Sequence, residues 1–141
     1  AFLKKLDSLH IRENIIKILK KYNFDNEKYI VISGASMVIH GIKDKTSDID
    51  IAVTKDYYEY LLNHYECIFE VTNMFNHRIY IIDNIINFGV DYFTKPEFIE
   101  DIPVQTLDDV LSLKKSLNRD KDKKDIELIE NKNNHFKHKL C

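Results

Sequence analysis

The chain is poor in the residues that would place it in several large protein classes. It has two cysteines, three glycines, two prolines and no tryptophan among its 141 residues. Two thiols build no disulfide framework, and no linker rich in glycine, serine or proline divides the chain. No apolar run approaches the length of a membrane span and no signal-peptide pattern opens the sequence, so we expect a cytoplasmic protein without membrane contact.

The remaining composition is that of a globular protein. Hydrophobic residues make up 44% of the chain and charged residues 31%, with a formal net charge of −2. This length and composition indicate one domain that is large enough for its own core. Because the chain has no basic excess, any contact with nucleic acid would have to be local.

The most informative stretch runs from residue 29 to residue 53. An apolar run that is short enough for a buried strand ends at Gly34, where the backbone can approach a phosphate without steric hindrance. The apolar residues that follow continue as a short helix, closed by Gly41. Backbone N–H groups and a hydroxyl at such a helix start favour an anion. The predicted phosphate-binding turn consists of Ser33, Gly34, Ala35 and Ser36.

The second half of this stretch brings two carboxylates to one place. Asp48 and Asp50 open a second predicted strand, and residues i and i+2 of a strand point to the same face, whereas Ile49 and Ile51 point into the core. Two carboxylates this close repel each other unless a cation lies between them, and hard oxygen ligands suit Mg²⁺ or Mn²⁺. The pattern therefore predicts a metal site for nucleotide phosphates.

The order of these residues resembles a known signature. Gly34-Ala35-Ser36, eleven further residues and then Asp48-x-Asp50 are similar to the motif of the DNA polymerase β-like nucleotidyltransferase superfamily. Its small bacterial members, the minimal nucleotidyltransferases and the AbiEii-type toxins, are the nearest match. Ala35 stands where a second glycine is frequent. Lys45 stands where the family often has arginine, so this nucleotide-binding candidate keeps the charge but loses bidentate geometry.

The resemblance also implies a third carboxylate on a later strand, which completes the metal site. Three β-rich runs, Cys67–Thr72, Arg78–Ile82 and Ile86–Phe93, predict a meander that continues the sheet. Asp91 lies in the third run among apolar and aromatic residues, where an aspartate is depleted and expensive to desolvate unless it faces a metal or a reacting group. Asp91 is therefore the candidate, whereas Asp83 reads as a turn residue.

A basic segment near the end of the chain resembles a second element of the same superfamily. In Arg119-x-Lys121-Asp122-x-x-Asp125 the order of charges is similar to a helix start that faces the nucleotide. The resemblance implies a role for Lys121, with Arg119 as a further candidate, in triphosphate binding. Because Lys121 and Asp125 are one helical turn apart, a surface ion pair between them is the alternative.

We predict an α/β fold of the α+β type, with a mixed, mostly antiparallel central sheet flanked by helices. An amphipathic helix is expected from Phe2 to Tyr22, and the cap residue Thr106 begins a later helix. The predicted nucleotidyltransferase domain covers residues 1–141, with an N-terminal helix in 1–28, a catalytic sheet core in 29–93, C-terminal helices in 104–132 and a flexible tail in 133–141.

The resemblance implies an enzyme that transfers a nucleoside monophosphate from an NTP, with ATP as the first candidate, to a hydroxyl group and releases pyrophosphate. Asp48, Asp50 and Asp91 would hold Mg²⁺ or Mn²⁺ ions, and Asp91 would also help to deprotonate the acceptor. The acceptor stays open among small molecules, RNA 3′ ends and protein hydroxyls, and a protein partner is possible.

Three alternatives remain at this point. A haloacid-dehalogenase-type phosphatase also uses Asp-x-Asp, but there the pair follows a long apolar strand, whereas here a polar segment precedes it. A catalytically weak or inactive module of a toxin-antitoxin-like system would keep the fold and act through its partner. The third alternative is a plain α/β domain whose acidic residues are solvated.

Overall fold

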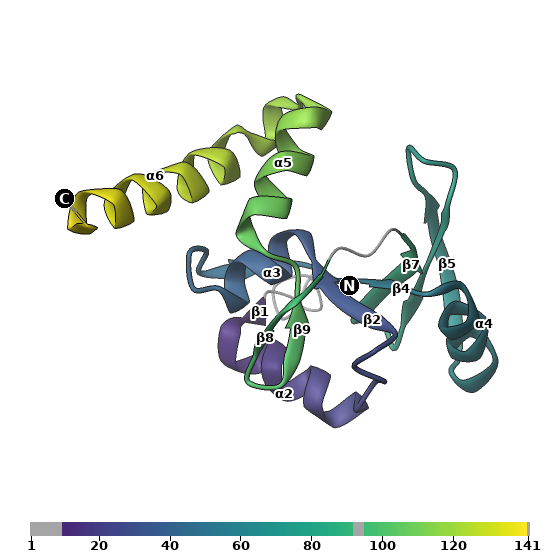
Figure 1. Ribbon diagram of the computed structural model, residues 1–141. Helices are drawn as coiled ribbons and strands as arrows, with labels where there is room; N and C mark the ends of the chain where they lie inside the picture. The colour runs from purple at the N-terminus through teal and green to yellow at the C-terminus, as the bar shows by residue number, and fades with distance from the viewer. Residues whose placement is uncertain (1–9, 92–94, 141) are drawn as a thin grey trace.

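The computed structural model of the chain describes residues 10–91 and 95–140. Within them the protein has an α+β fold, with five α-helices and a mixed, mostly antiparallel seven-stranded sheet, which confirms the predicted class (Figure 1). The sheet has the strand order β5-β6-β7-β4-β2-β9-β8. Its strands are β2 (Tyr29–Ile32), β4 (Ile49–Val53), β5 (Cys67–Thr72), β6 (Arg78–Ile82), β7 (Ile86–Val90), β8 (Glu97–Ile99) and β9 (Ile102–Val104).

Helices cover one face of this sheet, and the C-terminal pair lies beyond it. In Figure 1, α2 lies below the central strands and α5 rises above them. The side chains of Ile15 and Leu19 on α2 and of Leu61 on α4 are buried in one cluster with the central strands. The helices are α2 (Arg12–Tyr22), α3 (Ser33–Ile39), α4 (Lys55–His64), α5 (Leu107–Leu117) and α6 (Lys123–Leu140).

Successive side chains of the central strands point to opposite faces of the sheet, so one face is the apolar core and the other is polar. In register, Val31 of β2 pairs with Ile51 of β4, and Ile51 pairs with Phe88 of β7. All three side chains are at most 2% exposed. The neighbouring position on β4 is Asp50, which therefore points away from this apolar layer. As the sequence predicted, Ile49 and Ile51 enter the core.

The first helix of the described residues, α2, differs from the prediction of a helix over Phe2–Tyr22. It begins at Arg12 rather than Phe2, because His10–Ile11 forms the short strand β1, which pairs with β3 (Lys45–Thr46). Residues 1–9 lie outside the described residues. A two-residue strand is made by pairing with a distant segment, so the helical period of the local sequence does not reveal it.

Two further segments correct the sequence reading. The region between β7 and α5, which lies outside the predicted sheet core of 29–93, forms the β8–β9 hairpin, whose turn residues Glu100 and Asp101 have φ values of 49° and 68°. Asn-Gly, the usual signal for such a turn, is absent. The predicted tail also continues α6 as far as Leu140. A helix propagates easily once its first turns have formed and packed, even through a polar sequence.

A buried network of charges fastens the C-terminal helices together. The Nζ atom of Lys114 lies 2.9 Å from Asp122 Oδ1 and 3.3 Å from Asp125 Oδ2. Lys43, from the loop after α3, lies 3.3 Å from Asp125 Oδ1, and Arg119 Nε donates to Asp122 Oδ2 at 2.6 Å. Asp125 therefore pairs with Lys114 and Lys43, in place of the Lys121–Asp125 surface pair considered from the sequence.

This network also controls the ionisation of its carboxylates. Burial alone would raise the pKa of Asp122, but hydrogen bonds from Arg119 and Lys114 outweigh it and hold this pKa below its ordinary value. Lys114, Asp122 and Asp125 are all at most 9% exposed. The corner between α5 and α6 is therefore fixed by ion pairs that are shielded from water.

Replacing Lys114 by methionine should lower the free energy of unfolding by about 3 kcal/mol, because two buried carboxylates lose their shared cation. Lys115→Met is the matched control: this neighbouring lysine pairs with Glu130 on the surface, 54% exposed, so its loss should cost less than about 1 kcal/mol. Urea unfolding followed by circular dichroism measures both variants. Equal losses would contradict a special role for the buried network.

Candidate functional site

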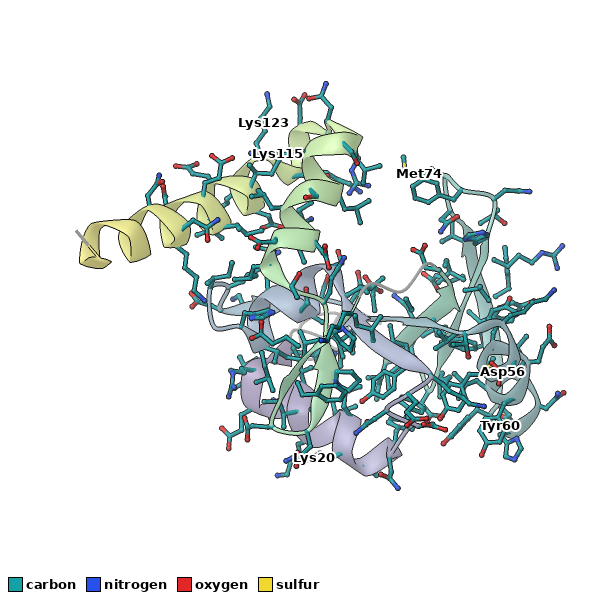
Figure 2. The ribbon with its side chains drawn as sticks, in the orientation of Figure 1. Lys20, Asp56, Tyr60, Met74, Lys115 and Lys123 are labelled. Carbon is teal, nitrogen blue, oxygen red and sulfur yellow. The ribbon has the colours of Figure 1, made fainter. Side chains whose placement is uncertain are left out.

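A cavity of about 470 Å³ lies on the polar face of the sheet. Three parts of the chain form it: the ends of the central strands, the β5–β6 hairpin and the connection between α5 and α6. Figure 2 shows the tip of the hairpin, marked by Met74, across from the C-terminal helices that carry Lys115 and Lys123. The polar residues that line the cavity are Ser33, Asp48, Asp50, Glu70, Asn73, Asn87, Asp91, Arg119 and Lys121.

The two predicted metal ligands lie together at the start of β4. Asp48 directly precedes the strand and is exposed, whereas Asp50 is the second residue of the strand and is half-buried. In the parallel pairing of β4 with β7, Asp50 lies opposite Asn87. Asn87 Nδ2 donates a hydrogen bond of 3.0 Å to Asp50 Oδ1. Asp50 is thus hydrogen-bonded to the side-chain amide of Asn87.

The surroundings of Asp50 favour its protonated form. Burial raises the pKa of Asp50 to about 6; the hydrogen bond from Asn87 opposes this rise, and the negative charge of Asp48 adds to it. A carboxyl group that resists ionisation in this way gains much from a nearby cation. The position therefore suits a metal ligand better than it suits an isolated buried acid.

Asp91 lines the same cavity but lies further along it. It follows the last residue of β7, four residues beyond Asn87, which corresponds to about 13 Å at the rise of a strand. In register, the end of β7 pairs with Val53 rather than with the start of β4. The fold therefore brings Asp91 into the cavity without bringing it to the pair of Asp48 and Asp50.

The predicted phosphate turn divides into lining and buried residues. Ser33 lines the cavity with a left-handed backbone, φ 58°, and its backbone N–H donates to Gln105 Oε1 at 3.1 Å. Ala35 and Ser36 are at most 1% exposed, and the Ser36 hydroxyl donates to the carbonyl of Ser33. The buried Ser36 hydroxyl thus stabilises the turn through its hydrogen bond to the Ser33 carbonyl.

Gly34 has a packing role beside the turn. A Cβ atom at this position would lie 2.9 Å from Thr46 Oγ1, so the absence of a side chain lets α3 approach β3 closely. Lys45, the other nucleotide-binding candidate on this side, is exposed on β3 opposite Ile11. Lys45 is not among the residues that line the cavity.

The basic segment reaches the cavity from the far side. Arg119 and Lys121 both line it: Arg119 directly precedes the short 3₁₀ turn Asp120–Asp122, and Lys121 is the middle residue of that turn. The hydrogen bond from Arg119 Nε to Asp122 anchors the guanidinium group to the buried network that contains Lys114. Two cationic side chains thus line one cavity with the carboxylates of Asp48 and Asp50.

The width of the cavity depends on close packing between β6 and β7. Gly89 lies opposite Ala52 of β4 and lines the cavity floor. A Cβ atom at Gly89 would lie only 2.4 Å from Ile79 Cδ1. The β5–β6 hairpin therefore stands close to the floor because this position has no side chain.

The sequence did not reveal several residues of this site. Asn87 was overlooked because an amide inside an apolar strand resembles no ligand motif, although the rule that parallel strands start at one edge would have placed it beside Asp50. Gln105, Glu70 and Asn73 come from segments that carry no signal of their own. His10 also lies near Asp48: burial lowers the pKa of His10, and the charge of Asp48 opposes that shift.

The residues present fit one hard cation. Asp48 and Asp50 offer carboxylate oxygens of the kind that Mg²⁺ and Mn²⁺ prefer. Among residues 10–91 and 95–140, no three histidine, cysteine, aspartate or glutamate side chains are grouped closely enough to hold a metal ion. The site can therefore supply two carboxylates, and further ligands would come from water or a bound substrate.

Comparisons of the chain with protein-family models, curated proteins and solved structures gave no match. The resemblance noted above therefore depends on its own residues and their arrangement. In the described part of the chain, no helix has both the length and the apolar character that crossing a membrane requires.

Asp50→Asn should stabilise the metal-free protein at neutral pH. The pKa of Asp50 is about 6 in the folded chain and about 4 in an unfolded one, so the ionised group destabilises the fold increasingly as the pH rises from about 4 to about 6. We expect a gain of about 2 kcal/mol at pH 7.5 and less than about 1 kcal/mol at pH 4.5. Urea unfolding in EDTA measures this gain; a loss of stability at both pH values would contradict it.

Proposed function

We propose that this protein is a metal-dependent nucleotidyltransferase. The observation that carries the proposal is that one cavity contains the pair Asp48 and Asp50 together with the cations Arg119 and Lys121, which lie about seventy residues away in the sequence. A metal-bound triphosphate needs both kinds of group, because it carries a cation and an excess of negative charge. The cavity volume of about 470 Å³ is within the range of small-molecule sites.

The residues divide the work between cation and phosphate. Asp48 and Asp50 hold Mg²⁺ or Mn²⁺, which when bound neutralises phosphate charge and stabilises the departing pyrophosphate. Arg119 and Lys121 bind phosphate oxygens from the opposite wall, where the fork of arginine suits two oxygens at once. Ser33 contributes its hydroxyl at the base of the cavity.

The proposed reaction is an in-line displacement at the α-phosphorus of an NTP. The acceptor hydroxyl oxygen forms a bond to this phosphorus as the bond to the bridging oxygen of the β-phosphate breaks, and pyrophosphate leaves. The hydroxyl proton passes to a carboxylate of the cavity. Asp91 remains the predicted base, and its distance along β7 favours contact with the acceptor over a share in the cation held by Asp48 and Asp50.

A second candidate function is a binding module that holds a nucleotide or a partner without transfer. It is favoured by a group of apolar side chains that are exposed on the β5–β6 hairpin beside the cavity. Such a group is more typical of an interaction surface than of a solvated loop. The exposed apolar residues are Ile68, Phe69, Val71, Met74 and Phe75.

Calorimetric titration with each of the four NTPs, with and without Mg²⁺, tests nucleotide binding. We expect metal-dependent binding, with ATP first among the candidates, that the double variant Asp48→Asn, Asp50→Asn loses while staying folded. Transfer of a labelled α-phosphate to an acceptor fraction then tests the chemistry. Binding without transfer would favour the second candidate, and a folded protein that binds no NTP would overturn the proposal.

Arg119→Ala and Lys121→Ala should each weaken NTP binding by about tenfold, since each removes a charge-assisted hydrogen bond to phosphate. Lys123→Ala is the matched control, because this lysine lies one turn further on, is 75% exposed and pairs with Asp120 outside the cavity. The affinities come from the same titrations. A loss with Lys123→Ala that equals the other two would show that only the general charge of the segment matters.

A further inference from the structure

We propose that Asn87 is a positioning residue that adapts the carboxylate site to a single divalent cation. The inference rests on the proposed function and deepens it. Asn87 is placed beside Asp50 by the parallel register of β4 and β7. Its side chain contacts this carboxylate directly, through the 3.0 Å bond from Nδ2 to Asp50 Oδ1.

The hydrogen bond assigns different roles to the two oxygens of Asp50. Oδ1 accepts the amide proton of Asn87, which restrains the rotation of the carboxylate and leaves Oδ2 for a cation. Groups that hold a metal ligand in this way influence metal affinity although they do not touch the ion. The neighbouring Asp48 is exposed at the mouth of the same site, so the second ligand is supplied without such a restraint.

The amide oxygen of Asn87 indicates that this residue does not increase the stability of the fold. Asn87 Oδ1 is buried and has no hydrogen-bond partner among the described residues. A buried acceptor without a partner is unfavourable by about 1–3 kcal/mol, and an apolar residue at this position would avoid that penalty. The amide is therefore explained by what its Nδ2 group does for Asp50.

The choice of amide over carboxylate also fixes the charge of the site. A carboxylate at position 87 would face Asp50 across neighbouring strands and add a third negative charge beside Asp48 and Asp50. Affinity for hard divalent cations rises with the number of charged oxygen ligands. With two carboxylates, the protein should bind the free ion weakly and take it up chiefly together with the phosphates of the nucleotide.

Binding of Mn²⁺ alone, followed by electron paramagnetic resonance without any nucleotide, tests this inference. Asn87→Asp should bind Mn²⁺ about tenfold more tightly than the wild type, because it adds a charged ligand next to Asp50. Asn73→Asp is the matched control. Asn73 lines the same cavity, and its Oδ1 accepts the backbone N–H groups of Phe75 and His77, contacts that an aspartate retains.

We expect Asn73→Asp to change Mn²⁺ affinity by less than about threefold, because its added charge lies away from Asp50. Equal gains in Asn73→Asp and Asn87→Asp would overturn the inference, since general electrostatics would then explain them. So would an Asn87→Asp variant that is folded, by thermal melting, and binds Mn²⁺ no better than the wild type.

Asn87→Ala separates positioning from charge and remains informative if Asn87→Asp fails to fold. This variant keeps the site charge at −2 but loses the restraint on Asp50, so Mn²⁺ binding should weaken by about tenfold. Unchanged affinity would overturn the positioning role. The Mn²⁺ results do not depend on turnover: a protein that shows these shifts but transfers no nucleotide would refute the proposed function and leave the role of Asn87 standing.

Discussion

The burial of the Asp50 carboxylate, with the negative charge of Asp48 beside it, is the constraint on which the rest of the site depends. Both carboxylates start one strand, and the inner one is half-buried, with a pKa raised to about 6. Such an arrangement persists only where positive charge or hydrogen-bond donors compensate it. The amide of Asn87 on the adjacent strand donates a hydrogen bond to Asp50, and the cations Arg119 and Lys121 of the C-terminal segment lie across the cavity.

The position of Arg119 depends in turn on a second set of ion pairs, which is buried between α5 and α6. Lys114 lies between Asp122 and Asp125, and Arg119 and Lys43 complete the set. The same ion pairs that join α5 to α6 therefore determine where Arg119 emerges. Arg119 thus connects the buried ion pairs to the cavity, so a substitution in the buried network should shift the position of this side chain.

The sequence predicted the parts of the fold that local patterns encode. The class, the strands around Asp50 and the cap at Thr106 are confirmed. The short strands β1, β3, β8 and β9 are products of pairing with distant segments, which no local period announces. For the same reason the sequence identified Asp48 and Asp50 as neighbours, yet only the register of β4 with β7 revealed that Asn87 joins them while Asp91 lies further away.

Gly89 has a consequence for how this cavity can vary. Because a Cβ atom there would lie 2.4 Å from Ile79 Cδ1, any larger residue would displace the end of the Ile79 side chain, which lines the same cavity. The shape of the cavity beside its floor thus depends on the absence of a side chain at one position. One substitution at Gly89 would therefore change the shape of this cavity without altering any of the charged groups that line it.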